Sequence, residues 1–288
     1  MGHFSHPCPF VPASGLSVHP GKPPPGRKGW NGGQGLPLLE HPHPRSVLLI
    51  GRGAGGDLRE VLKHPVEEVH YVELDPLVIE AAQRYLPPQD RAVFNDPRVS
   101  VFHLDGRLYV KRSKGTFDVI IVDLPEPYTG QLNRFYTQEF FQEAKNILKE
   151  GGIFSLSLPS AENYLSPELA RRNASVYHTL RSVLPSVMVL PGDTNFFLAS
   201  FSPLTDDYRL LIQRLRERGI ENRWVNEPYI EYIFTTDRFR LIQRDLNEEK
   251  RSPAKPGHVP YLLLLRYGAL ALPLLLRPEG GVLRGIPA

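Results

Sequence analysis

The sequence of 288 residues contains a single cysteine, Cys8, and this scarcity excludes several kinds of protein. One thiol cannot form an intramolecular disulfide, and it cannot build a zinc or iron–sulfur site that needs several cysteines. Charge of one sign is also lacking, because 34 lysines and arginines face 31 aspartates and glutamates, a formal net charge of +3. Nucleic-acid-binding proteins concentrate basic residues on one face, so we expect no nucleic-acid partner.

Long apolar runs are scarce as well. The most apolar stretch, residues 261–276, has 16 residues and is interrupted by Arg266 and Pro273. A membrane-spanning helix needs about 20 apolar residues. We therefore interpret residues 251–288 as an apolar tail that is buried or lies at an interface. A second interpretation stays open, in which the sequence stops where a membrane region begins and the tail brings the protein close to a membrane.

Proline and glycine are abundant and unevenly placed. Of the 29 prolines and 24 glycines, 10 and 8 lie in residues 1–44, together with 5 of the 10 histidines. Proline removes a backbone donor and glycine raises the entropy cost of ordering, so we expect residues 1–44 to form a disordered or extended arm. His41 and His43 belong to this arm, and we expect no metal site there, because no other ligand residues cluster nearby.

The arm also lacks the pattern of a secretory signal, since no charged segment precedes an apolar run. We therefore expect a cytoplasmic protein, with the tail of residues 251–288 as the segment that would place it at the cytoplasmic face of a membrane.

Strand and helix patterns alternate from residue 46. The expected strands are short apolar runs, and they cover residues 46–50, 68–74, 98–104, 117–123 and 152–158. The expected helices have capping residues or apolar positions at helical spacing, and they cover residues 58–64, 77–86, 137–148, 167–184 and 205–218. Two apolar segments, residues 186–190 and 195–201, predict an antiparallel pair.

This alternation predicts an α/β fold, a Rossmann-like doubly wound sheet that is mostly parallel and carries an antiparallel pair at one edge. We assign residues 45–250 to one domain with this fold. Arg214, Arg216 and Arg218 lie along the last expected helix, and we interpret them as a solvated face.

A glycine-rich loop follows the first expected strand. Gly51, Gly53 and Gly56 fit the pattern G-x-G-x-x-G, which lets a backbone approach a ligand closely at the start of a helix. The pattern is weak by itself. Gly55 lies in the same loop, and we include it among the candidate ligand-binding residues.

Acidic residues end the next three expected strands, where ligands bind in open parallel sheets. Glu73 comes 20 residues after Gly53 and is placed to accept hydrogen bonds from both hydroxyls of a ribose. Asp105, followed by Gly106, can accept from an adenine amino group, or it serves only as a helix cap. Asp123 ends the fourth strand. A nicotinamide-binding sheet is not expected to have the last two acids, so the combination favours an adenosylmethionine-type ligand and the class I S-adenosylmethionine-dependent transferase fold.

Three specific runs cover the same region, namely VLLIGRGAGGDLREVLKHPVEEVHYVELDPLVIEAAQRYLP, DPRVSVFHLDGR and FDVIIVDLPEP. Over roughly residues 39–201 the sequence resembles the polyamine aminopropyltransferases, that is, the spermidine synthase family. The runs QLNRFYTQEFF, LPSAENY and PGDTNFFLAS, with the apolar C-terminal tail, are similar to bacterial spermidine synthase-like proteins that are often joined to membrane segments.

The resemblance implies an enzyme that moves an aminopropyl group from decarboxylated S-adenosylmethionine to a polyamine acceptor such as putrescine, releasing methylthioadenosine. It also implies that Glu73 holds the ribose and Asp105 the adenine, that Gly51 and Gly53 form the loop beneath the sulfonium, and that the protein forms a homodimer.

The same resemblance implies the catalytic residues. Asp123 matches the first acid of the family motif D-S-x-D-P, and Glu126 stands at its catalytic aspartate. We expect Glu126 to act as general base toward the attacking amine. Glu73, Asp105, Asp123 and Glu126 together predict an acidic site that suits a cationic substrate.

Three features differ from the family pattern. The loop G-G-G-D-G-G reads GRGAGG, so that Ala54 replaces the aspartate that contacts the substrate amine, and Glu126 is one methylene longer than aspartate. Residues 1–44 stand where the family has an N-terminal β-domain that helps to bind the amine. Residues expected to select the acceptor lie on the loops after the fourth and fifth strands, and they are Tyr128, Gln131, Asn133, Arg134, Tyr136, Asn163 and Tyr164.

Two alternatives stay open. One is a class I S-adenosylmethionine-dependent methyltransferase, since this type of sheet often serves methyl transfer. The other is a non-catalytic nucleotide-binding module linked to a membrane partner.

Overall fold

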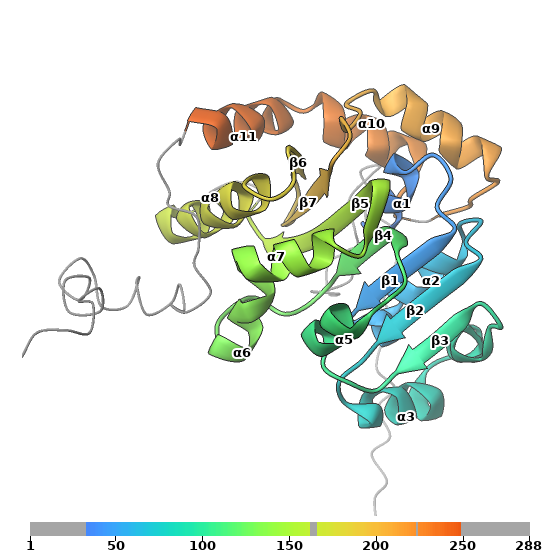
Figure 1. The fold of residues 1–288 in the computed structure, drawn as a ribbon. Helices are drawn as coiled ribbons and strands as arrows, with labels where there is room; N and C mark the ends of the chain where they lie inside the picture. Colours follow the sequence, from blue (N-terminus) through green and yellow to red (C-terminus); the bar gives the residue numbers. More distant parts are fainter. Residues whose placement is uncertain (1–32, 162–165, 223, 249–288) are drawn as a thin grey trace, which may run out of the picture.

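The structure is a computed structural model that describes residues 33–161, 166–222 and 224–248. Seven strands of this part form one sheet in the order β3-β2-β1-β4-β5-β7-β6 (Figure 1). The strands are β1 (Ser46–Ile50), β2 (Glu68–Val72), β3 (Val99–Phe102), β4 (Phe117–Val122), β5 (Leu148–Pro159), β6 (Ser186–Leu190) and β7 (Thr194–Ser200). Strands β1 to β5 pair in parallel, and β7 pairs antiparallel with both β5 and β6. The predicted mostly parallel sheet with an antiparallel edge pair is confirmed.

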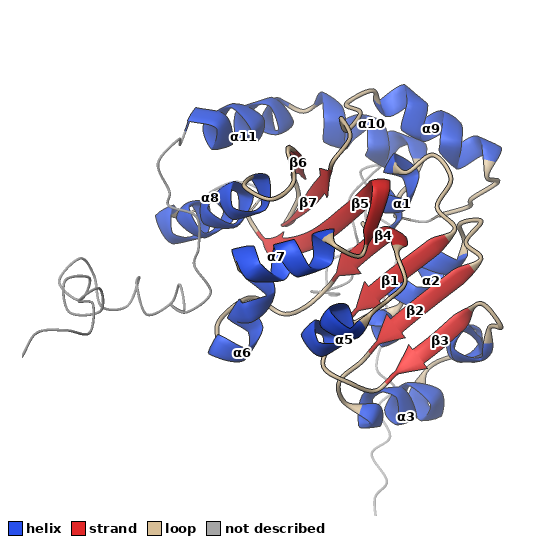
Figure 2. Cartoon of the chain, viewed as in Figure 1, coloured by secondary structure: helices blue, strands red, loops and turns tan. Residues whose placement is uncertain are grey.

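Helices cover both faces of the sheet, as Figure 2 shows. Successive side chains of a strand point to opposite faces, so Leu48 and Ile50 of β1 join one buried cluster while Val47 and Leu49 join the other. The first cluster is covered by α5 (Gly106–Arg112), α7 (Gln138–Lys145) and α8 (Pro167–Arg181). The second is covered by α1 (Gly35–Glu40), α2 (Asp57–Leu62), α3 (Pro76–Tyr85), α9 (Tyr208–Glu217) and α10 (Glu227–Thr235). The double covering explains why β1 is buried along its whole length.

The remaining helices are short or lie at the periphery. They are α4 (Pro88–Arg91), α6 (Gly130–Asn133), α11 (Asp237–Glu248) and the 3-10 turns η1 (Gly53–Gly55), η2 (Ala92–Asn95) and η3 (Arg134–Tyr136). Within the described ranges, no helix has the length and apolarity needed to cross a membrane. The apolar tail of residues 251–288 lies outside the described residues.

Local capping signals place several helices correctly. Asp75 accepts a hydrogen bond from the Leu77 amide at 2.9 Å ahead of α3, and Thr137 accepts from the Phe140 amide at 3.4 Å ahead of α7. The predicted end of α7 is wrong, because the helix stops at Lys145 and Leu148 already begins β5. The apolar side chain of Leu148 fits a helix face and a buried strand equally well. Leu148 belongs to the strand because it pairs with Phe117 of β4.

The expected disordered arm is wrong for its last part. Leu36, Leu38 and Leu39 of α1 are buried in the core, so order begins before residue 44, while residues 1–32 lie outside the described residues. Arginines of α9 and of the turn after it hold this segment in place. Arg214 donates to the Leu39 carbonyl at 2.7 Å, and Arg218 donates to the Leu38 carbonyl at 2.7 Å.

These contacts also correct the prediction of a solvated arginine face on α9. Arg218 donates further to the His41 carbonyl at 2.7 Å and to the Pro42 carbonyl at 2.8 Å. Two of the three arginines therefore satisfy the last carbonyls of α1, which a helix end leaves without intrahelical partners. Arg216 alone behaves as predicted, since it is exposed and pairs with Glu227.

Candidate active site

The carboxyl ends of β1 to β4 lie along one edge of the sheet, where their arrows end in Figure 1. Backbone hydrogen bonds join neighbouring ends: the Gly51 amide donates to the Val72 carbonyl at 3.1 Å, and the Asp123 amide donates to the Ile50 carbonyl at 3.0 Å. The Glu73 amide donates to the Phe102 carbonyl at 3.0 Å. The structure therefore brings the predicted loop and the predicted acids to the same edge.

The glycines of the loop have different roles. Gly51 has a φ of +85°, and a Cβ atom there would lie 2.5 Å from the Asp123 carbonyl oxygen. A Cβ on Gly53 would lie 2.5 Å from the Tyr71 ring, and one on Gly106 would lie 2.5 Å from Ile50 Cγ2. These three glycines are required by packing within the protein. A Cβ on Gly55 would meet nothing within 4 Å, so packing does not require a glycine at this position.

Glu73 is held in a fixed orientation by a buried tyrosine. The Tyr71 hydroxyl donates to Glu73 Oε2 at 3.2 Å and accepts from the Ala54 amide at 3.1 Å, while the Asp75 amide donates to Glu73 Oε1 at 3.2 Å. Burial, followed by the Glu73 charge, raises the pKa of Tyr71 well above its usual value, so the hydroxyl stays a donor. A carboxylate has about four acceptor sites, and Glu73 keeps enough of them for two ribose hydroxyls.

Tyr71 links the glycine loop to the acid at the end of β2. Tyr71 was not among the predicted site residues, because in the run EVHYV it has the alternation of an ordinary core residue. The feature of the sequence that could have indicated its role is its position two residues before Glu73, which places both side chains on the same face of the strand.

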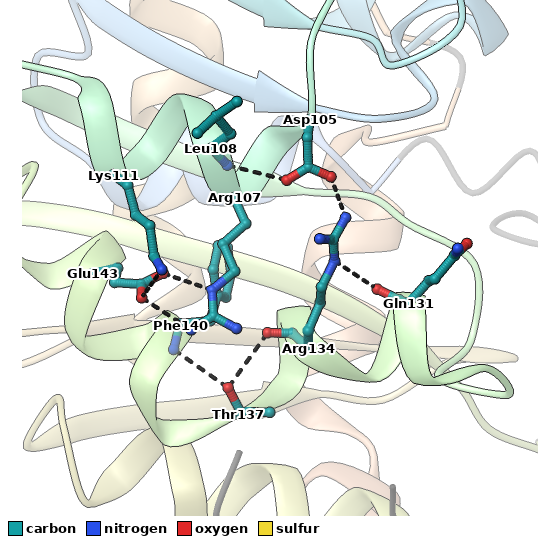
Figure 3. Close-up of polar contacts among 9 residues, drawn as sticks. All are labelled: Asp105, Arg107, Leu108, Lys111, Gln131, Arg134, Thr137, Phe140 and Glu143. Atoms are coloured by element: carbon teal, nitrogen blue, oxygen red, sulfur yellow. Dashed lines mark hydrogen bonds and ion pairs between the residues drawn. The ribbon is translucent and has the colours of Figure 1, made fainter. Parts of the chain in front are cut away.

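Asp105 caps a helix, which is one of its two predicted roles, and it also pairs with an arginine. Figure 3 shows that Oδ1 caps α5 by accepting from the Leu108 amide at 3.0 Å and that Oδ2 forms an ion pair with Arg134. Arg134 also donates to the Gln131 carbonyl at 2.9 Å, which ties the segment of α6 and η3 to the end of β3. An adenine amino group would share the carboxylate with this arginine.

Asp123 is buried and forms a pair with a second carboxyl group. Ser157 Oγ donates to Asp123 Oδ1 at 3.0 Å, and Arg52 Nη1 lies 3.9 Å from the same oxygen. Burial first, and then the Asp123 charge and hydrogen bond, raises the pKa of Asp57 well above its usual range. Burial, the neighbouring Asp123 charge and the hydrogen bond between the two carboxyl groups therefore all favour the protonated form of Asp57.

Sequence reasoning missed Asp57. It is the first residue of α2, directly after the glycine loop, and a carboxylate at such a position ordinarily serves to balance the helix dipole.

Glu126, the predicted general base, pairs with Arg172 of α8. The arginine is only 9% exposed and its Nη1 donates to Glu126 Oε2. The Tyr136 hydroxyl shapes the loop between β4 and Glu126 by donating to the Leu124 carbonyl at 3.3 Å and to the Pro125 carbonyl at 3.2 Å. Arg172 lies on the face of α8 that turns inward, and no local pattern distinguishes it from the exposed Arg171.

The residues expected to select an acceptor are dispersed. Tyr128 is 62% exposed, whereas Asn133 and Tyr136 are buried and serve the fold of their loop. Asn163 and Tyr164 lie outside the described residues. Among the residues that are described, no group of three or more histidine, cysteine, aspartate or glutamate side chains is arranged to hold a metal ion.

Arginines lie beside three of the four acids that were predicted to form an acidic site. Arg134 compensates Asp105, Arg172 compensates Glu126, and Arg52 lies beside Asp123. The sequence shows the acids at the strand ends, but the arginines come from three other segments.

Sheet order, glycine loop and the acids at the strand ends define a Rossmann-like α/β domain of the nucleotide-binding kind. Residues 34–197 match the family model described as spermine/spermidine synthase domain. The chain belongs to the spermine/spermidine synthase family.

Curated relatives and solved structures agree with this assignment. A polyamine aminopropyltransferase of Thermotoga maritima is 48% identical over 121 residues, which are 42% of this chain and 40% of that protein. One of Pyrobaculum neutrophilum is 34% identical over 201 residues, 65% of this chain and 67% of that protein. The chain thus spans two fifths to two thirds of the length of these relatives.

Two crystal structures have the same fold. Spermidine synthase from Thermotoga maritima superposes with a TM-score of 0.61 at 32% identity, covering 74% of this chain and 72% of that one. A spermidine synthase in complex with the transition state analogue AdoDATO superposes with a TM-score of 0.60 at 31% identity, covering 74% and 71%.

Proposed function

We propose that this protein is an aminopropyltransferase that moves the aminopropyl group of decarboxylated S-adenosylmethionine to an amine acceptor, of which putrescine is the family's example. The observation that carries the proposal is the Glu73 carboxylate, fixed by Tyr71 at the end of β2 beside the glycine loop. It supports a ribose-binding role, and the family to which the chain belongs supports the nucleotide.

The transfer needs little beyond positioning. The amine nitrogen attacks the carbon next to the sulfonium, a C–N bond forms while the C–S bond breaks, and neutral methylthioadenosine leaves. The attacking amine loses a proton, which we assign to Glu126. A carboxylate has lone pairs on both oxygens, so Glu126 can accept this proton while one oxygen contacts Arg172. Asp123, which shares a hydrogen bond with Asp57, contributes negative charge near the sulfonium.

A thermal-shift experiment tests the nucleotide assignment. We expect methylthioadenosine and decarboxylated S-adenosylmethionine to raise the melting temperature, since a ligand that binds only the folded state stabilises it. Glu73→Ala abolishes the rise, and the matched control Glu80→Ala, an exposed residue of α3, retains it. Absence of a shift with both ligands in the unmodified protein would falsify the assignment.

Methyl transfer is the second candidate, and Ala54 favours it, because the acid that contacts the substrate amine in the family is replaced there. Incubation with labelled putrescine and each of the two donors separates the reactions by product mass. The homodimer and the membrane contact implied by the resemblance stay predictions.

A further inference from the structure

Arg172 has hydrogen-bonding groups that the protein does not use. Its Nη1 contacts Glu126, but its buried Nε and Nη2 have no hydrogen-bond partner. The side chain is 10% exposed, so these two nitrogens do not lie on an open surface. Leaving charged donors buried without an acceptor is unfavourable, and native structures rarely tolerate it without a functional reason.

The two unused nitrogens form one recognition edge. Nε and Nη2 carry the parallel N–H bonds with which a guanidinium binds both oxygens of a carboxylate. The same chain shows this use: Arg107 donates through Nε at 2.8 Å and through Nη2 at 2.9 Å to the two oxygens of Glu143 (Figure 3). Arg172 thus presents, beside Glu126, an edge that in Arg107 is filled by a carboxylate.

The position of Arg172 in the fold places its Nε and Nη2 edge on the side of β4 and β5. Glu73 and Asp105 follow β2 and β3, on one side of β1, whereas Glu126 follows β4 and Arg172 lies on the helix after β5. Glu73 and Asp105, which we expect to bind the nucleoside, therefore lie on one side of the loop after β1. The ion pair of Arg172 and Glu126 lies on the other side. The side of β4 and β5 is where the transferred chain and the acceptor would lie.

The surroundings fit an anionic group better than a second cation. Arg172 neutralises Glu126, and its Cζ atom lies 5.9 Å from the centre of the Tyr128 ring. Arg52 lies near Asp123, and Ala54 carries no charge. A simple diamine has two positive charges at neutral pH and would meet an arginine at this place.

We propose that Arg172 binds a carboxylate carried by a substrate of this enzyme. The inference rests on the proposed transfer reaction and deepens it by naming the substrate class. The carboxylate has two sources that the test separates: an acceptor of the amino-acid type, such as ornithine in place of putrescine, or S-adenosylmethionine, the donor that retains its carboxylate. With the second source, the transferred group is 3-amino-3-carboxypropyl in place of aminopropyl. In either case the C–N bond forms, the C–S bond breaks and the proton goes to Glu126, as above.

Calorimetric titration of the full chain distinguishes these sources with two pairs of ligands. Ornithine and putrescine differ by one carboxylate, and so do S-adenosylmethionine and its decarboxylated form. We expect the carboxylate-bearing member of one pair to bind about tenfold tighter or more. The pair that shows the preference identifies the source. Arg172→Gln removes the preference, and Arg171→Gln, its exposed neighbour on α8, retains it.

Arg172→Gln leaves the Glu126 charge without its partner, so the double variant Arg172→Gln/Glu126→Gln is measured beside it. Ornithine and putrescine are titrated both with and without methylthioadenosine, and methylthioadenosine is titrated alone. Equal affinities within both pairs, or a preference that persists in a folded Arg172 variant, overturn the role of Arg172. Failure of methylthioadenosine to bind overturns the nucleotide assignment instead, so the two failures are separable.

Discussion

Replacing Glu40 by glutamine is expected to change how stability depends on pH. Glu40 ends α1 and is 6% exposed; its Oε1 accepts from the Thr205 amide at 2.7 Å, and its buried Oε2 has no hydrogen-bond partner. Burial, only partly offset by the Thr205 amide and the Arg214 charge, raises the pKa of Glu40 from 4.5 to about 7. The folded protein therefore holds this proton more tightly than the unfolded chain does.

The sign follows from the two pKa values. Between pH 4.5 and about 7 the folded state binds more protons at Glu40 than the unfolded state, so the free energy of unfolding falls as pH rises. The stability linked to the protonated side chain is fully present below pH 4.5 and lost as pH rises through about 7. The rise of the Glu40 pKa from 4.5 to about 7 corresponds to roughly 3 kcal/mol in the free energy of unfolding, at about 1.36 kcal/mol for each pKa unit.

Urea unfolding of the unmodified protein and of Glu40→Gln between pH 4 and 8 tests this estimate. Glutamine does not titrate and keeps an oxygen for the Thr205 amide. We therefore expect the free energy of unfolding of the variant, relative to that of the unmodified protein, to rise by about 3 kcal/mol from pH 4 to pH 8. Subtracting the free energies of unfolding of the two proteins at each pH cancels the contributions of other titrating groups, such as the buried His64. Glu150→Gln, at an exposed position, is the control and runs parallel to the unmodified protein. A difference between Glu40→Gln and the unmodified protein that is constant with pH refutes the reasoning.

Two further predictions concern the site. Gly51→Ala lowers the free energy of unfolding by about 1–3 kcal/mol, because of the positive φ and the contact with the Asp123 carbonyl, whereas Gly55→Ala leaves it unchanged. Urea unfolding measures both, and equal losses contradict the assignment of packing to Gly51. Tyr71→Phe removes the hydroxyl that joins Glu73 to the Ala54 amide, so methylthioadenosine binds about tenfold more weakly in a calorimetric titration. An unchanged affinity would show that Glu73 needs no such support.

The sheet could be predicted because its signals are local. The run SVLLI before a glycine cluster, and the cap formed by Asp75 with Pro76 after it, each specify an element within a few residues. Parallel pairing then brings the carboxyl ends of the strands together without any knowledge of side-chain contacts. This is why the positions of Glu73, Asp105 and Asp123 along one edge follow from the sequence.

The first helix could not be predicted because its stabilising contacts are distant in sequence. The segment GLPLLE contains a glycine and a proline and is too short to be stable alone. Arg214 and Arg218 donate to its carbonyl groups across more than 170 residues, and Thr205 donates to Glu40. Composition favours disorder here, and tertiary contacts outweigh it.

The pairing of charges separates the two halves of the site. Asp105 and Glu126 each form an ion pair with an arginine, and Asp123 lies beside Arg52 and shares a hydrogen bond with Asp57. Glu73 differs, because the contacts described for it come from the uncharged Tyr71 hydroxyl and the Asp75 amide. Its carboxylate is thus oriented by uncharged groups, which suits the ribose-binding role that we propose. On the side of β4 and β5, Glu126 is paired with Arg172 before any substrate binds, so we expect selection of the acceptor to depend on which group the remaining edge of Arg172 admits.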